Sequence, residues 1–111
     1  MTASPAQQTA WQKQAHKVLG ALIDRAYREG LPPLSWTIGD AGVTLVGRAN
    51  YPAGDRREAI TAWAAALGIA MSERLRGEGA ALFGTAEHVD TPQGWASVTL
   101  TAEILEDDGD E

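Results

Sequence analysis

Cysteine is absent from this chain of 111 residues, which excludes disulfide bonds, thiolate catalysis and cysteine-based zinc or iron–sulfur sites. No apolar run approaches the roughly 18 residues that a membrane span needs. The first residues, MTASPAQQTAWQKQ, lack the basic-then-apolar order of a signal peptide. The length fits one domain, and 44% hydrophobic residues can build its core. We therefore expect a single cytoplasmic domain.

Histidine is scarce, and no catalytic motif is present. His16 and His88 lie far apart in the sequence, and no His, Asp or Glu cluster has a metal-ligand spacing. The sequence also lacks a Gly-x-Ser-x-Gly elbow and a glycine-rich phosphate loop. Glu87 and Glu103 fall in predicted neighbouring strands, where they are either a carboxylate pair for acid–base chemistry or, more simply, solvated residues. We expect no enzymatic activity, no metal and no cofactor.

Positive charge is also in short supply, with nine Lys and Arg against fifteen Asp and Glu. Residues 106–111 read EDDGDE, and removing their five carboxylates from the net charge of −6 leaves −1 for the remainder. We expect residues 1–105 to form the domain and residues 106–111 to be an acidic, disordered tail. Such a tail either solubilises the chain or attracts a basic partner. Binding to a phosphate backbone normally requires a basic face, so nucleic acid is not the expected partner.

The pattern over residues 4–30 predicts a first amphipathic helix. Ser4 suits the N-cap, Pro5 the first helical position, and Gln7 completes a capping box. Gly30 is a natural C-terminal stop. An apolar stripe recurs at three- and four-residue spacing: Trp11, Ala15, Val18, Leu19, Leu22, Ile23 and Ala26.

A second helix is predicted from Asp55, as N-cap with Glu58 as its capping-box partner, to Gly68. Its apolar stripe consists of Ile60, Trp63, Ala64 and Leu67. Residues 69–76 are ambiguous, because good helix formers would extend the helix to Arg76. We favour a stop at Gly68, since Ile69 fits the hydrophobic contact of a helix C-cap and the following residues alternate like a strand.

Strict apolar–polar alternation predicts the strands. A hairpin covers residues 34–47, with a turn at 39–42. Further strands are expected at 69–75, 81–89 and 95–105, joined by turns at 76–80 and 90–94. The predicted fold is therefore a single α+β domain of order α-β-β-α-β-β-β, an antiparallel sheet with two helices on one face.

Three phrases, LPPLSWTIGDAGVTLVGRA, RREAITAWAAALGI and VTLTAEI, carry a resemblance over residues 31–105. In them the chain resembles small uncharacterised α+β proteins of actinobacteria and their phages or mobile elements. The resemblance rests on a hairpin and a helix and transfers no functional residue. It implies a one-domain, cytoplasmic α+β protein.

Alternation gives the predicted sheet an outer face. Trp11, Trp36 and Trp63 fall on apolar stripes and are expected to meet in one core. Trp95 instead alternates with polar residues, on the side away from the core. The outer residues are either a solvated sheet face or a docking surface for a partner, because tryptophan is enriched among interface anchors: Thr37, Thr44, Val46, Trp95, Ser97 and Thr99.

Arginines gather where the second strand leads into the second helix. Arg48, Arg56 and Arg57, with Asn50, are expected to converge there, and a helix N-terminus attracts anions. The simpler interpretation is a solvated first turn. Two functions follow. The first is a non-catalytic protein-interaction module that binds a protein partner or a second copy through the outer face. The second is an accessory protein that binds an anion or nucleic acid through the arginines.

Overall fold

The structure is a computed structural model that describes residues 3–39, 41–50, 53–77 and 79–104. This part of the chain is an α+β domain in the predicted element order, and the predicted acidic tail at 106–111 lies outside it. Its elements are α1 (Pro5–Glu29), β1 (Ser35–Ile38), β2 (Thr44–Ala49), α2 (Ala53–Leu67), β3 (Ser72–Arg76), β4 (Gly79–Thr91) and β5 (Gly94–Ile104).

Local signals place both ends of α1 as predicted. The Ser4 hydroxyl accepts a hydrogen bond from the Gln7 N–H at 3.1 Å, which satisfies one of the free donors of the first turn. Gly30 takes the left-handed conformation with a φ of 72°, and its N–H bonds the Ala26 carbonyl. Both ends of the helix are therefore fixed by local hydrogen bonds and by the backbone conformation of Gly30.

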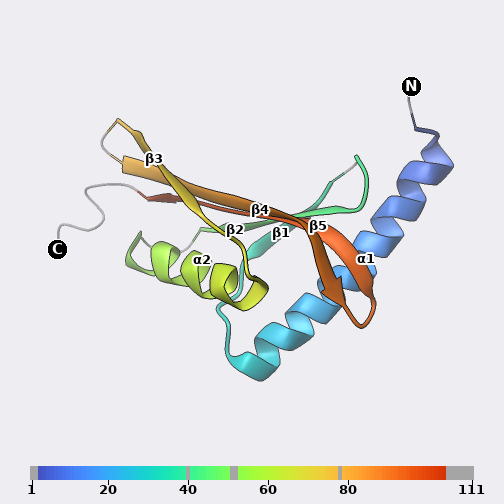
Figure 1. Cartoon of the computed structure of the whole chain (residues 1–111), viewed down its shortest axis with the longest axis horizontal. Coiled ribbons are helices and arrows are strands. Elements are labelled where there is room, and N and C mark those ends of the chain that lie inside the picture. Colours follow the sequence, from blue (N-terminus) through green and yellow to red (C-terminus); the bar gives the residue numbers. More distant parts are fainter. Residues whose placement is uncertain (1–2, 40, 51–52, 78, 105–111) are drawn as a thin grey trace.

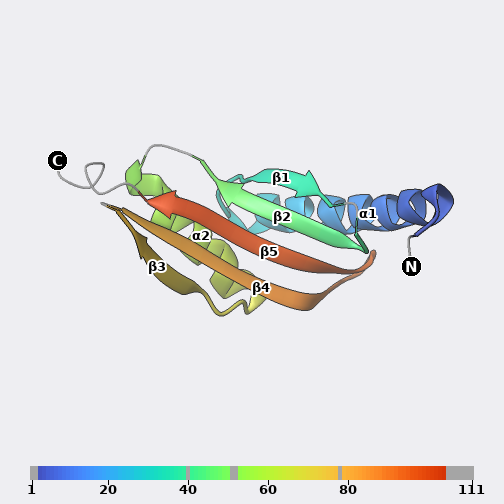
Figure 2. The same cartoon turned by 90° about the horizontal axis from the view of Figure 1, so that it is seen from above.

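The five strands form one sheet of order β1-β2-β5-β4-β3. The prediction of a wholly antiparallel sheet is wrong at one pair, because β2 and β5 run parallel. The connection through α2 delivers the chain to the far edge, and two hairpins then fold β4 and β5 back until β5 lies beside β2 (Figure 2). Since β3 and β5 flank β4 in an antiparallel meander, both share the direction of β2.

Both helices cover the same face of this sheet. In Figure 1 the sheet is seen close to edge-on, with α2 and the C-terminal part of α1 below it and the N-terminal part of α1 rising past its end. α1 contacts β2 and β5, and α2 packs mainly on β5. The opposite face carries no helix or strand of the described chain, and Figure 2 looks onto it. The predicted two-layer arrangement, with both helices on one face, is present.

The boundaries of α2 differ from the prediction at its start and agree at its end. The helix begins at Ala53, so Asp55 lies in the first turn and is not the N-cap. It ends before Gly68, whose φ is 70°, and the Ile69 N–H bonds the Ala64 carbonyl at 2.9 Å. Ile69 is buried. Because this C-cap breaks the helix, the segment beyond forms a strand, which starts at Ser72 instead of residue 69.

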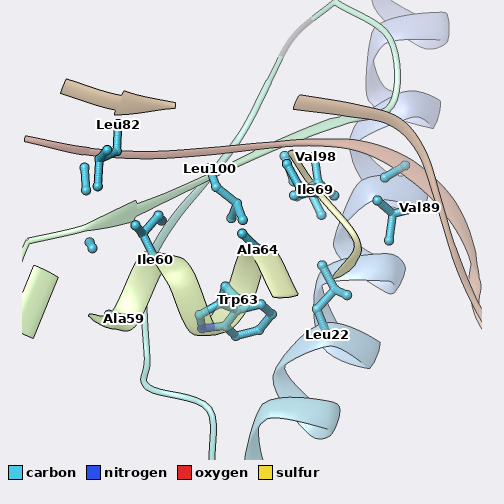
Figure 3. Packing of buried hydrophobic residues seen from close by; sticks show 14 of the residues in the cluster. Leu22, Ala59, Ile60, Trp63, Ala64, Ile69, Leu82, Val89, Val98 and Leu100 are labelled. Atoms are coloured by element: carbon cyan, nitrogen blue, oxygen red, sulfur yellow. The ribbon is translucent and has the colours of Figure 1, made fainter. Parts of the chain in front are cut away.

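The core lies between the helix layer and the sheet (Figure 3). Trp63 is buried at its centre, and its ring meets the edge of Trp36 at a centroid separation of 5.4 Å. Trp11 is only half-buried and does not belong to this cluster of described residues. The prediction that three tryptophans meet is therefore wrong for Trp11, since it lies in the first half of α1, toward the end that extends past the sheet (Figure 2).

Two glycines in the sheet allow close packing on its inner side. Gly47 lies opposite Trp36 in the β1–β2 ladder, and a Cβ atom there would lie 2.9 Å from two ring carbons of Trp36. Gly84 leaves room for the segment that precedes β3, since its Cβ would lie 2.5 Å from the Ala70 carbonyl oxygen. Such distances are far below ordinary carbon contacts, so both positions need a residue without a side chain.

Candidate functional site

The ladder register brings the predicted outer residues together on the uncovered side of the sheet. Thr37 pairs with Val46, Val46 with Thr99, and Thr44 with Ser97. Trp95 lies two residues before Ser97 on the same side of β5. We call the whole surface the open face, and it consists of Ser35, Thr37, Thr44, Val46, Arg48, Ser72, Arg74, Ala81, Phe83, Thr85, Trp95, Ser97, Thr99, Thr101 and Glu103.

The centre of the open face is a floor of short side chains. The Thr85 and Thr99 hydroxyls lie 2.9 Å apart and share a hydrogen bond across β4 and β5. Val46 and Thr37 continue the same row over β2 and β1. β-Branched residues suit a pleated surface, and this row carries no charge. The floor therefore offers methyl groups and hydroxyls that any flat partner surface can contact.

An aromatic residue and a basic residue stand at one end of the floor. Phe83 pairs with Thr101, and its side chain is 41% exposed. The Arg74 guanidinium lies 6.0 Å from the centre of the Phe83 ring, at the outer limit of a cation–π contact. Sequence reasoning missed Phe83, because the consecutive apolar residues Leu82 and Phe83 hide the period of β4. The signal becomes visible only once the register with β5 is known.

A second aromatic group stands at the other end. Trp95 is 44% exposed, and the His88 ring stacks on it at 4.7 Å with an interplanar angle of 15°. A β-bulge between Ala86 and Val89 adds an extra residue there, which re-aims the strand. His88 Nε2 also lies 2.9 Å from Asp90 Oδ1. Six residues of β5 separate Trp95 from the row of Phe83, so the two aromatic ends stand about 20 Å apart.

The structure brings two of the three predicted arginines together. Arg48 and Arg56 line one hollow of about 310 Å³ at the ends of β2 and β5, with Asn50 and Thr101. Arg56 Nη1 donates to the Glu103 carbonyl at 2.8 Å.

The Arg57 side chain does not line this hollow and instead forms an ion pair with Glu73, with Nη1 lying 3.2 Å from Oε1. The expected convergence of all three arginines is therefore not present, because neighbouring residues of α2 point in different directions around the helix. Arg57 reaches the β3 side of the sheet, while Arg56 reaches β5.

The carboxylates predicted in neighbouring strands do not form a pair. Glu103 lies opposite Ala81, and Glu87 is six residues further along β4, which separates the two by about 20 Å. Within the described residues, no group of three or more His, Asp or Glu is placed to hold a metal ion. No helix in the described ranges combines the length and apolar character needed to cross a membrane.

No protein-family model, curated protein or solved structure matches the chain. No residue therefore acquires a role by similarity, and the resemblance to small actinobacterial and phage proteins stays a prediction.

Proposed function

We propose that the chain is a non-catalytic, cytoplasmic protein-interaction module that binds a partner protein through the open face. One observation carries the proposal. Within the part of the chain that the structure describes, helices cover one side of the sheet only, and the other side presents Phe83 and Trp95 at its two ends.

The chemistry of the open face fits a protein partner better than a solvated surface alone. Aromatic residues commonly supply the few contacts that carry most of the binding energy at protein interfaces. The uncharged row between them removes the cost of burying unpaired charge. Threonine hydroxyls such as those of Thr85 and Thr99 already share a hydrogen bond, so their burial leaves fewer polar groups unsatisfied.

The test compares open-face variants with a matched control. The full chain is coupled to a matrix, partners from the native host are identified, and each purified partner is titrated against Trp95→Ala and Phe83→Ala. We expect at least one variant to weaken binding by more than tenfold. Leu75→Ala is the control, since Leu75 is 80% exposed on the helix side of the sheet. Equal losses in all three variants, or none in the open-face pair, would contradict the proposal.

The hollow beside Arg48 and Arg56 favours a second candidate function, binding of an anion or nucleic acid. The two guanidinium groups face a common hollow with the polar side chains of Asn50 and Thr101, a donor set that suits phosphate oxygens. Glu103 lines the same hollow and opposes an anion there, which is why this candidate ranks second.

Heparin chromatography distinguishes this second candidate. Retention of the full chain that is lost in Arg48→Ala/Arg56→Ala, and kept in the control Arg28→Ala, would support it. Arg28 serves as the control because it is exposed and lies in the last turn of α1. An unretained wild-type chain at low salt would dismiss the arginine hollow as a polyanion site.

A further inference from the structure

Among the described strands, β1 pairs only with β2, and its outer edge is short and uncharged. β1 is one of the two edge strands of the sheet, and its four residues read SWTI. The Gly39 N–H bonds the Thr44 carbonyl. Because hydrogen-bonded positions alternate along an antiparallel ladder, Trp36 and Ile38 direct their backbone N–H and C=O groups away from β2. Backbone groups that no other described strand pairs are a template for another strand.

The opposite edge is protected in the usual way. β3 carries Glu73 and Arg74 within its five residues, and charges on an edge strand discourage pairing. A two-fold pairing of β3 centred on Arg74 would place two arginines directly opposite each other, which is unfavourable. The two edges of the sheet are thus unlike, because β3 carries charged residues and β1 carries none.

An apolar groove runs beside the β1 edge on the helix side. Its volume is about 280 Å³, and its lining includes Ile23, Tyr27, Leu34 and Trp36. Tyr27 is 91% exposed and Ile23 is 50% exposed. Both belong to α1, the helix that contacts β1 from the helix layer. A tyrosine that is almost fully exposed at the rim of an apolar groove gains by being covered.

We propose that a second copy of this chain occupies the β1 edge and the groove beside it. Antiparallel pairing of β1 about a two-fold axis at Thr37 sets Trp36 against Ile38 of the second copy, and the reciprocal pair forms by symmetry. Every facing pair is uncharged. Tyr27 of each copy then lies at the junction of the two helix layers. The two sheets join into one, and their open faces become one continuous surface.

The size of this contact predicts a reversible dimer. Two tyrosine rings bury about 300–500 Å² together, and the four-residue strands add a short ladder. Such a contact is smaller than the roughly 1,200 Å² at which the range of stable interfaces begins. The dimer therefore dissociates on dilution, and its population depends on protein concentration. Ser35 and Thr37 of β1 also belong to the open face, but this inference rests on the backbone groups of Trp36 and Ile38 and on the groove beside them, so it does not depend on the proposed function.

Sedimentation equilibrium of the full chain over a wide concentration range measures the association. We expect a monomer–dimer equilibrium that Tyr27→Glu and Thr37→Lys each weaken by at least tenfold. Tyr27 is too exposed to affect folding, and Thr37→Lys places two like charges at the axis. Leu75→Glu is the matched control, because it changes another exposed apolar residue, 80% exposed, on β3. Far-UV circular dichroism confirms that all variants are folded.

Hydrogen exchange at high and low protein concentration locates the interface. The Trp36 and Ile38 amides should gain protection as the dimer forms, while the amides of β3 should not. A strict monomer at millimolar concentration would overturn the inference. So would a dimer that survives both Tyr27→Glu and Thr37→Lys, or one whose protection maps to β3.

Discussion

The close approach of Trp36 to Gly47 makes Gly47→Ala a sharp test of the packing at β1. Alanine is normally the better strand residue, and replacing a strand glycine gains about 0.5–1 kcal/mol from the unfolded state. Here the new Cβ would lie 2.9 Å from two carbons of the Trp36 ring. Overpacking of this kind costs about 1–3 kcal/mol. The two terms leave a net destabilisation of about 0–2.5 kcal/mol.

Removing Trp36 reverses the sign. Trp36 is half-buried and touches Trp63 edge to ring, so Trp36→Ala should cost about 2–3 kcal/mol, less than the 3–5 kcal/mol of a fully buried aromatic residue. In that background the new methyl group of Gly47→Ala still approaches the Leu34 Cδ1 atom at 3.0 Å, but this is the end of a flexible side chain that can move, so the substitution should stabilise by up to about 1 kcal/mol. The double-mutant cycle therefore predicts a coupling energy of about 1–3 kcal/mol.

Urea unfolding of the four proteins, followed by far-UV circular dichroism, supplies the free energies. Fluorescence is unsuitable because two of the four proteins lack Trp36. Equal m-values across the set confirm that the folded states expose similar surface. A coupling energy near zero would refute the placement of the Trp36 ring over Gly47.

Three further predictions concern local packing and surface charge. Gly84→Ala should lower the free energy of unfolding by about 1–3 kcal/mol, whereas Gly20→Ala, in an open part of α1, should raise it by about 0.5–1 kcal/mol; paired urea titrations check both. Ser4→Ala should cost about 1 kcal/mol through loss of the N-cap, visible as a lower Tm. A double-mutant cycle on Arg57 and Glu73, which are 49% and 44% exposed, should give about 0.2–1 kcal/mol and shrink in high salt.

Patterns confined to a few neighbouring residues predicted the elements well. The period of two over residues 34–47 assigns each residue of the hairpin to one face, and the register confirms that Trp36 and Leu45 share the inner side. The caps at Ser4 and Gly30 depend on nearby backbone groups, so the local sequence is enough to predict them. Gly68 followed by Ile69 predicted the helix stop for the same reason.

Features that depend on pairing between distant segments could not be predicted from the sequence. The apolar–polar alternation of β2 and β5 is the same whether the two strands run parallel or antiparallel. It therefore could not predict that they pair in parallel. The bulge that aims His88 at Trp95 depends on a register between two strands. The different directions of the Arg56 and Arg57 side chains could have been predicted, since consecutive helical residues lie about 100° apart around the axis.

The open face and the β1 edge are roughly perpendicular surfaces of one sheet, so partner binding and self-association need not compete. If both proposals hold, each dimer presents two copies of the threonine floor with Phe83 and Trp95 on one continuous surface. A partner with two binding epitopes would then bind with avidity, because the second contact becomes intramolecular. Tyr27→Glu would weaken binding to such a partner while leaving the affinity for a single epitope unchanged. Trp95→Ala would weaken both, which separates the contribution of each surface.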